Sequence, residues 1–334
     1  MAGLLVDVYG LSELPAATTR VSCLWLHHPR LQERGYMADI AARCVGAWRV
    51  GRGEAEESGS GGGNGRRGLI ALAYDQRNHG SRLVDARANE AWRQGNERHA
   101  VDMFGVVEGM VADQKVLLDL VEGYLFADGK RKIDQHLALG ISLGGHSVWQ
   151  LMFAEPRVTA GVVVIGCPDY MHLLTDRARL SKLSTYSAED NGASFLGSKD
   201  FPTSLVEACK KADPKAMFFG ADAVPAATTA SGSVNAVARQ IFQERLRGKK
   251  FLLCSGGADK LVPYRCAEPF LQWFKQAAGL WFKDEDVSVD DRTYPGIGHA
   301  FSAEMVKDSV DFIVETVASA DQGAIGDEQR ASKI

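Results

Sequence analysis

The fold is decided by the stretch His136-Leu-Ala-Leu-Gly140-Ile-Ser142-Leu-Gly144-Gly145-His146-Ser-Val-Trp149. An apolar run ends in a Gly-x-Ser-x-Gly motif, and apolar residues at helical spacing follow it. A strand, a sharp turn and a helix in this order form a nucleophile elbow, which holds its serine on a strained backbone. The residues two before and two after that serine must be small, and here both are glycine. We therefore expect Ser142 to be a nucleophile at the end of a strand.

Strands and helices alternate on both sides of this stretch. Besides the strand before Ser142, apolar runs predict strands over residues 21–27, 69–74, 161–167 and 251–255. Residues 4–9 predict a possible edge strand, and another strand is expected near 287–294. Helical spacing predicts helices over residues 36–48, 98–127, 266–278 and 302–318. This alternation is typical of an α/β protein with a mostly parallel central sheet and helices on both faces.

The alternation is interrupted once. Residues 1–168 and 249–320 read as the α/β core, whereas residues 169–248 predict only helices, near 170–183, 203–212 and 233–247. An insertion of this length is too long for a connecting loop, so we interpret it as a helical lid. The Gly/Ser-rich stretch 51–68 predicts a flexible surface loop, and residues 321–334 form a polar tail.

Composition limits the class of protein. The chain has 334 residues, of which 46% are hydrophobic, and a net charge of −4. A slightly acidic chain without Lys/Arg blocks argues against nucleic-acid and membrane partners, and a small-molecule acyl substrate is expected instead. Six cysteines without a CxxC pair predict free buried thiols, and the absence of a signal-peptide pattern predicts a cytoplasmic protein. The oligomeric state stays open.

A serine hydroxyl needs an imidazole base and a carboxylate that orients this base. Asp259 follows an apolar strand and a Gly-Gly-Ala turn, and His299 follows a late strand in a Gly-Ile-Gly-His turn. Functional groups of parallel sheets gather at the carboxyl ends of strands, so the two residues are expected to meet Ser142 there. Asp169, directly after the preceding core strand, is the rival acid.

On these motifs the chain resembles the α/β-hydrolase superfamily. The resemblance rests on Gly140-Ile-Ser142-Leu-Gly144, on Gly257-Ala-Asp259-Lys-Leu-Val-Pro263 and on Gly298-His299, in the chain order of that superfamily. Asp75-Gln-Arg-Asn-His79-Gly80-Ser81 resembles a loop that many members carry. The resemblance covers residues 20–318 and implies an α/β-hydrolase fold with Ser142, Asp259 and His299 as catalytic residues. It does not define a substrate.

The segment expected to complete the oxyanion hole departs from the superfamily pattern. The backbone N–H of Leu143 is the expected first donor of the oxyanion hole. The second donor usually follows the first central strand, where many members carry His-Gly-x, but this chain has His27-His28-Pro29-Arg30. Because Pro29 has no N–H, His28 is the expected donor, with Arg30 or a nearby side chain as the alternative.

These residues predict a serine hydrolase that cleaves an ester, thioester or lactone with an apolar acyl part. The expected substrate contacts are His27, Arg30, His146 and Tyr170. No cofactor is expected, and no metal, since no spaced ligand set completes a site with His27-His28. Acyl transfer to a hydroxyl, macrolactone formation and carbon–carbon bond hydrolysis stay open, as does a catalytically silent ligand-binding protein.

Overall fold

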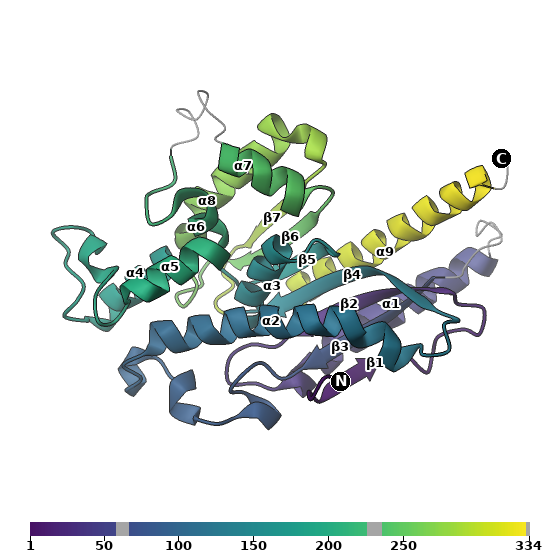
Figure 1. Ribbon diagram of the computed structural model, residues 1–334, viewed down its shortest axis with the longest axis horizontal. Helices are drawn as coiled ribbons and strands as arrows, with labels where there is room; N and C mark the ends of the chain where they lie inside the picture. The colour runs from purple at the N-terminus through teal and green to yellow at the C-terminus, as the bar shows by residue number, and fades with distance from the viewer. Residues whose placement is uncertain (58–66, 226–235, 332–334) are drawn as a thin grey trace.

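The computed structural model describes residues 1–57, 67–225 and 236–331, with the side chains of residues 52–57 and 323–331 left out of that description. Its centre is a seven-stranded sheet, as the sequence predicts (Figure 1). The strands are β1 Val6–Tyr9, β2 Arg20–His27, β3 Arg67–Tyr74, β4 Lys132–Ile141, β5 Val158–Val164, β6 Lys250–Gly256 and β7 Ser288–Tyr294.

The strand order is β1-β3-β2-β4-β5-β6-β7. β1 pairs with β3 in the antiparallel sense, and the other neighbours are parallel. At the end of β4, Gly140 is in register with His27 of β2, and Ile141 is in register with Val164 of β5. The carboxyl ends of the central strands therefore meet at one edge of the sheet, where the loops that follow them converge.

Helices cover both faces of the sheet. The helices are α1 Ala38–Glu57, α2 His99–Leu125, α3 Leu143–Ala154, α4 Tyr170–Ser181, α5 Thr203–Ala212, α6 Pro214–Phe219, α7 Ala236–Ile241, α8 Tyr264–Gln276 and α9 Ala303–Ala331. α1 and α9 pack on one face, and α2, α3 and α8 pack on the other (Figure 1). The central strands are thus buried on both sides, which explains why they read as continuous apolar runs.

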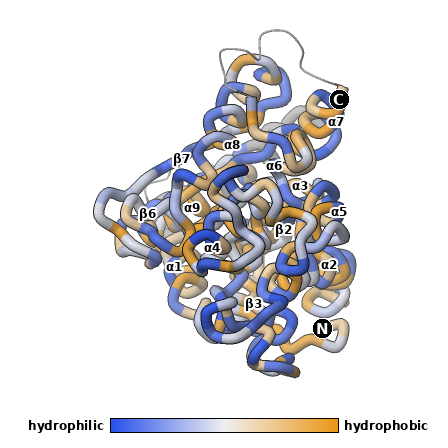
Figure 2. The backbone as a smooth tube through the Cα atoms, turned by 90° about the vertical axis from the view of Figure 1, so that its left-hand side faces the viewer, coloured by the Kyte–Doolittle hydropathy of each residue, from blue (hydrophilic) through white to orange (hydrophobic). Residues whose placement is uncertain are grey.

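The alternation of side chains along β2 shows how one strand supplies both cores. Cys23 and Trp25 belong to the core beneath α2 and α3, whereas Leu24 and Leu26 belong to the core beneath α1 and α9. Successive side chains of a strand point to opposite faces, so a buried strand must be apolar at every position. Figure 2 shows the hydrophobic segments gathered around the strands and the elbow helix α3.

The segment predicted as a lid is helical. It contains α4, α5, α6 and α7, followed by the π-helical turn Phe242–Leu246. Its Phe218 ring lies 4.7 Å from Trp273 of α8 and 6.0 Å from Phe153 of α3, measured between ring centroids. Part of this segment therefore packs on the core.

Several boundaries differ from the sequence prediction. α1 continues to Glu57 and β3 begins at Arg67, so the predicted loop 51–68 is shorter, and its residues 58–66 lie outside the described residues. α9 continues to Ala331 through most of the predicted polar tail. Both extensions are rich in Glu, Ala, Gln and Arg, which favour helices by their intrinsic propensity. α6 was not predicted, because six residues are too few for a periodic signal.

Candidate functional site

Ser142 occupies the turn between β4 and α3. Its backbone dihedral angles are φ 55° and ψ −111°, a conformation that is strained for a residue with a side chain. A Cβ atom at Gly144 would lie 2.1 Å from the carbonyl oxygen of His27, and one at Gly140 would lie 2.1 Å from the carbonyl oxygen of Gly144. Both flanking glycines are therefore required by close backbone contacts, as the motif predicts.

Ser142 is hydrogen-bonded to a histidine that is itself bonded to an aspartate. The Oγ atom of Ser142 lies 2.8 Å from Nε2 of His299, and Nδ1 of His299 lies 2.8 Å from Oδ2 of Asp259. The Asp259 side chain is fully buried, whereas 24% of the His299 side chain is exposed. We call these three residues the triad. The structure brings all three predicted residues into direct contact.

The carboxylate of Asp259 is held in its charged form. Burial alone would raise its pKa, but hydrogen bonds from His299 and from the backbone N–H groups of Val262 and Leu261 hold the pKa below its usual range. Asp169, the rival acid, instead accepts a bond from the N–H of His172 at the start of α4. The structure therefore places Asp259 and not Asp169 beside His299.

The loops that carry Asp259 and His299 are bonded to each other. The N–H of Ala258 donates to the carbonyl of Ile297 at 2.8 Å. A Cβ atom at Gly256 would lie 2.4 Å from the carbonyl oxygen of Gly298. Gly256, which the sequence analysis did not single out, thus allows the close approach of the two loops. Its signal was the pair Gly256-Gly257 directly after a strand.

The two expected oxyanion-hole residues lie next to the elbow. Leu143 is the first residue of α3, where backbone N–H groups have no partner within the helix. The ring of His28 is already engaged, because its Nε2 accepts from the N–H of Gln76 at 3.0 Å and its Nδ1 lies 2.8 Å from the carbonyl of Pro29. Burial lowers the pKa of His28 to about 4, so the ring is neutral. Only the backbone N–H of His28 is left as a donor.

A bracing network around Gln76 and Asp75 escaped the sequence analysis. The Gln76 side chain donates to the carbonyl of His28, in addition to the bond from its backbone. Asp75 accepts from the N–H and the guanidinium of Arg34, at 2.8 and 2.7 Å, and from the hydroxyl of Ser81 at 2.6 Å. The loop after β3 therefore fixes the loop after β2, which carries His28.

Three of the four predicted substrate contacts are corrected by their burial. His27 is fully buried and bonds to Gln114 of α2, so its side chain lies in the core. Tyr170 is 2% exposed and donates to the carbonyl of Ala100 at 2.7 Å. His146 is 4% exposed, and its Nδ1 accepts from the N–H of Cys167 at 3.0 Å. Each of these side chains is buried because its neighbours along β2, α3 or α4 are apolar residues that pack in the core.

Arg30 is partly exposed, and it has a counterpart that the sequence analysis missed. Its Nη1 donates to the carbonyl of Asn89 at 2.5 Å. Arg177 of α4 donates from Nη2 to the carbonyl of Leu261, two residues beyond Asp259. Leu173 and Leu174, one turn earlier on α4, are buried. An arginine in an apolar helical stripe was therefore the overlooked signal.

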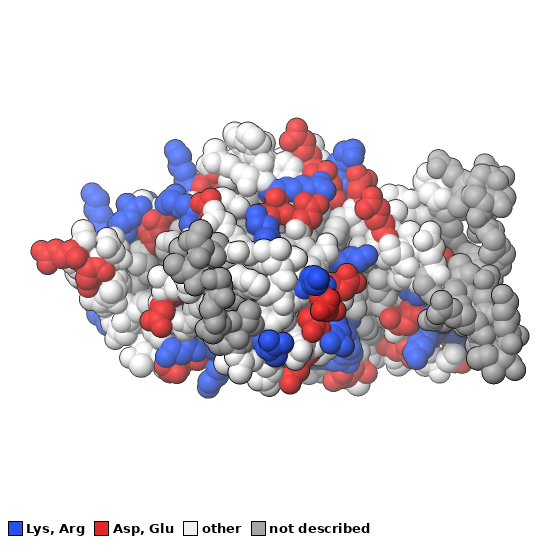
Figure 3. Space-filling view, turned by 90° about the horizontal axis from the view of Figure 1, so that it is seen from above, with Lys and Arg blue, Asp and Glu red and all other residues white. Residues whose placement is uncertain are grey.

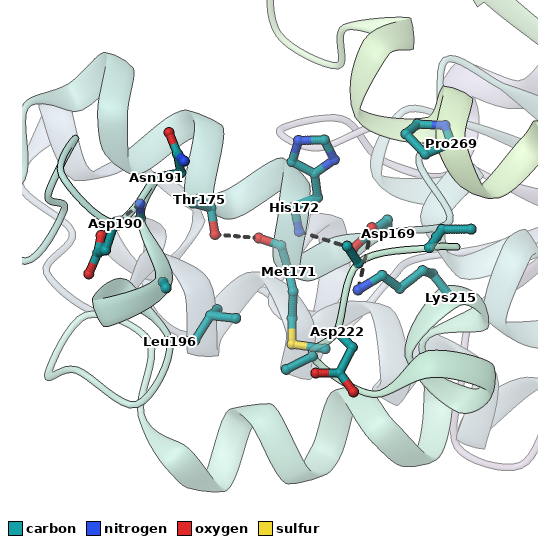
Figure 4. A pocket seen from close by; sticks show the side chains of 15 residues that line it. Asp169, Met171, His172, Thr175, Asp190, Asn191, Leu196, Lys215, Asp222 and Pro269 are labelled. Carbon is teal, nitrogen blue, oxygen red and sulfur yellow. Dashed lines mark hydrogen bonds and ion pairs between the residues drawn. The ribbon is translucent and has the colours of Figure 1, made fainter. Parts of the chain in front are cut away.

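Two cavities in the described part of the chain lie away from the triad. One, of about 400 Å³, opens beside α4 and is lined by Asp169, His172 and Lys215 among others (Figure 4). In Figure 4 the ammonium of Lys215 faces the carboxylate of Asp169, at 3.8 Å. The other, of about 370 Å³, lies between Glu108 and Phe153. No triad residue lines either cavity.

Three further expectations concern the cysteines, metal ligands and membrane-spanning helices. All six cysteines are buried and free, as predicted. Within the described ranges, no group of three or more His, Cys, Asp or Glu side chains is placed to hold a metal ion. None of the described helices combines the length and the apolar character that crossing a membrane requires.

No family model and no curated protein matches the sequence. The structure is similar to TT1662 from Thermus thermophilus, with 14% identity, 95% of each chain covered and a TM-score of 0.52. It is also similar to a monoacylglycerol lipase from Paleococcus ferrophilus, with 13% identity, 93% of this chain and 98% of that chain covered and a TM-score of 0.47. A third similar structure is Est1E from Butyrivibrio proteoclasticus with bound ferulic acid, with 13% identity, 95% and 94% coverage and a TM-score of 0.46.

Proposed function

The chain has the α/β-hydrolase fold, and on this premise we propose that it is a serine hydrolase acting through an acyl-serine intermediate. The observation that carries the proposal is the unbroken hydrogen-bond chain from Ser142 through His299 to Asp259. This chain supplies a nucleophile, a base and a group that orients the base. The proposed substrates are esters, thioesters or lactones.

In the proposed first half-reaction, Nε2 of His299 removes the hydroxyl proton of Ser142 while Oγ bonds to the acyl carbonyl carbon. Asp259 stabilises the imidazolium that forms. The N–H groups of Leu143 and His28 bind the oxyanion of the tetrahedral intermediate. The bond to the leaving group then breaks, and His299 returns the proton to it.

In the second half-reaction, water attacks the acyl-serine and gives its proton to His299. The carboxylic acid leaves, and the proton returns to Ser142, so the enzyme is regenerated. A hydroxyl on the same substrate could replace water and give a lactone, and one on another molecule would give a transferred ester. Product analysis separates these outcomes, and water is the acceptor that we propose.

The lid role of residues 169–248 and the apolar acyl pocket belong to the same proposal. Support comes from the aromatic side chains that this segment contributes near α3 and α8. A substrate pocket beside these side chains would be lined by apolar groups. An apolar acyl chain is therefore the proposed non-reacting part of the substrate.

The proposal is tested by substrate profiling of the purified protein. We expect turnover of at least one class among 4-nitrophenyl esters, acyl-thioesters and lactones, and a loss of several orders of magnitude in kcat for Ser142→Ala. Ser147→Ala is the matched control, because Ser147 lies on the same helix and bonds only the carbonyl of Leu143. A folded wild type without turnover would favour a ligand-binding protein instead, and full activity in Ser142→Ala would overturn the mechanism.

A further inference from the structure

Two arginine side chains near the triad form no direct ion pair, although Glu90 acts on the charge of Arg30 and Asp259 on that of Arg177. Among the described residues, neither Arg30 nor Arg177 has a carboxylate oxygen within 4.0 Å. By contrast, Arg179 on the same helix pairs with Asp176 at 2.7 Å, and Arg34 pairs with Asp75. On the face shown in Figure 3, basic and acidic side chains also lie intermixed. Two arginines that are partly buried without a direct ion pair therefore require an explanation.

Arg177 is surrounded by neutral and weak acceptors. Its Nη1 lies 3.4 Å from Nε2 of His99 and 3.3 Å from Sδ of Met103, and its Nη2 lies 3.2 Å from the carbonyl of Leu261. Its Nε is buried and has no partner among the described residues. Burial lowers the pKa of Arg177 to about 10, so the group is still charged at neutral pH.

The two guanidinium groups approach the same short segment of the chain. Arg30 donates to the carbonyl of Asn89, and Arg177 lies against His99, whose Nδ1 is 2.9 Å from the carbonyl of Glu90, the residue after Asn89. Burial and the charges of Arg177 and Arg30 together lower the pKa of His99 to about 3. The charge of Arg30 also lowers the pKa of Arg177. Two like charges in a partly buried region repel each other, and an anion between them would remove this cost.

This positive region adjoins the elbow from two sides. Leu261, which accepts from Arg177, donates its own N–H to Oδ1 of Asp259. Arg30 belongs to the loop after β2, whose His27 carbonyl packs against Gly144. The charge of Arg177 also acts on His146, in the first turn of α3. The pKa of His146 is lowered to about 3, first by burial and next by the charge of Arg177. Arg177 is thus linked through Leu261 to the triad acid Asp259.

We propose that Arg30 and Arg177 bind one carboxylate of the substrate, so that the preferred substrate is an ester with a single negative charge near the scissile bond. The inference rests on the proposed function and refines its substrate class. Glu90 lies within electrostatic range of Arg30, so the local charge favours a monoanion over a phosphate dianion. Planar guanidinium groups match the two oxygens of a carboxylate.

The test compares two esters of matched shape. The 4-nitrophenyl monoester of adipic acid carries a terminal carboxylate, and 4-nitrophenyl 6-methylheptanoate has an isopropyl group in its place. We expect a kcat/KM about ten- to hundredfold higher for the anionic ester, which is the range of a charge-assisted pair. The neutral ester corrects each variant for changes in basal activity.

The variants assign this preference to the arginines. Arg177→Gln and Arg30→Gln are each expected to bring the anionic-to-neutral ratio close to one, mainly through KM, and Arg177→Lys is expected to keep part of it. Arg179→Gln is the matched control, since Arg179 lies on the same helix but pairs with Asp176. An unchanged ratio in both glutamine variants overturns the proposal.

A binding measurement separates this inference from the proposed function. Monomethyl adipate, which carries one carboxylate, is expected to raise the melting temperature of Ser142→Ala by about 2 °C or more, and not that of Ser142→Ala/Arg177→Gln. If the melting temperature rises as expected but the wild type hydrolyses no ester, the anion site is supported and the proposed function fails. If the neutral ester is turned over without preference for the anionic one, the anion site fails alone. Stronger stabilisation by inorganic phosphate than by monomethyl adipate overturns the carboxylate assignment.

Discussion

The Nε2 atom of His299 lies 2.8 Å from the Oγ atom of Ser142, although 157 positions of the chain separate the two residues. The contact depends on two loops that follow β6 and β7. Because Gly256 has no Cβ, the first loop packs directly against the carbonyl of Gly298 in the second. The position of the imidazole is therefore set by backbone contacts beyond the triad.

The first prediction concerns this packing. Gly256→Ala places a Cβ 2.4 Å from the carbonyl oxygen of Gly298, so the histidine loop must shift. A displacement of about 1 Å in a catalytic group costs about a hundredfold in rate, and we expect kcat to fall by at least that factor. Gly105→Ala, in open space on α2, is the control and is expected to retain activity. Wild-type kcat in a folded Gly256→Ala protein would contradict this account.

The second prediction distinguishes the two candidate acids. Asp259→Asn keeps an oxygen for the N–H groups of Leu261 and Val262 but leaves His299 without a carboxylate. We expect kcat to fall by about 10⁴-fold, as for loss of a triad aspartate. Asp169→Asn, measured on folded protein, is expected to keep kcat within a few-fold of wild type. The reverse result would assign the acid to Asp169.

The third prediction concerns Asp75. Burial alone would raise the pKa of this carboxyl, but bonds from Ser81 and Arg34 lower it to about 2. Asp75→Asn is therefore expected to reduce the free energy of unfolding at neutral pH by about 2 kcal/mol. Because the folded pKa is depressed, this contribution is complete above the unfolded pKa near 4 and is lost as the pH falls through 2. Urea denaturation at pH 7 measures it, and equal stability of variant and wild type would contradict it.

The fourth prediction concerns acid stability. Five buried histidines have a pKa lowered mainly by burial, to about 3 or 4 in each case: His27, His28, His99, His136 and His146. In the unfolded chain these rings take up protons near pH 6.5, so stability falls as the pH drops from about 6.5 towards 4. Each ring contributes about 1.4 kcal/mol per pH unit in this window. Thermal melts between about pH 7.5 and 5 measure the slope, and a melting temperature independent of pH in this range would contradict the assignment.

The sequence was sufficient to predict most of the architecture. Apolar runs located β2, β3, β4 and β6 within a few residues, because central strands of a sheet covered on both faces are apolar throughout. The turn residues around Ser142, Asp259 and His299 likewise predicted which strand ends would meet. Apolar runs reflect side-chain burial, and the glycine-rich turns reflect backbone strain, so both are visible in short stretches of sequence.

Residues whose role depends on long-range neighbours could not be predicted in this way. His27 reads as a loop-proximal polar group, yet its partner Gln114 lies on a helix that only the folded chain brings near. The same is true of Arg177, whose contact at Leu261 is 84 positions away. The predicted end of the last helix was wrong because residues 319–331 lack an apolar periodicity but include good helix formers, and α9 continues to Ala331.

The central claim is that the triad makes Ser142 nucleophilic, and covalent labelling tests it most directly. The folded protein is treated with a fluorophosphonate, and the modified residue and the rate of labelling are determined by mass spectrometry. We predict one adduct, on Ser142, and a rate that falls by about 10³-fold or more in His299→Ala, because the hydroxyl then lacks its base. No labelling of Ser142 in the folded wild type, or labelling that is equally fast in His299→Ala, would contradict the account.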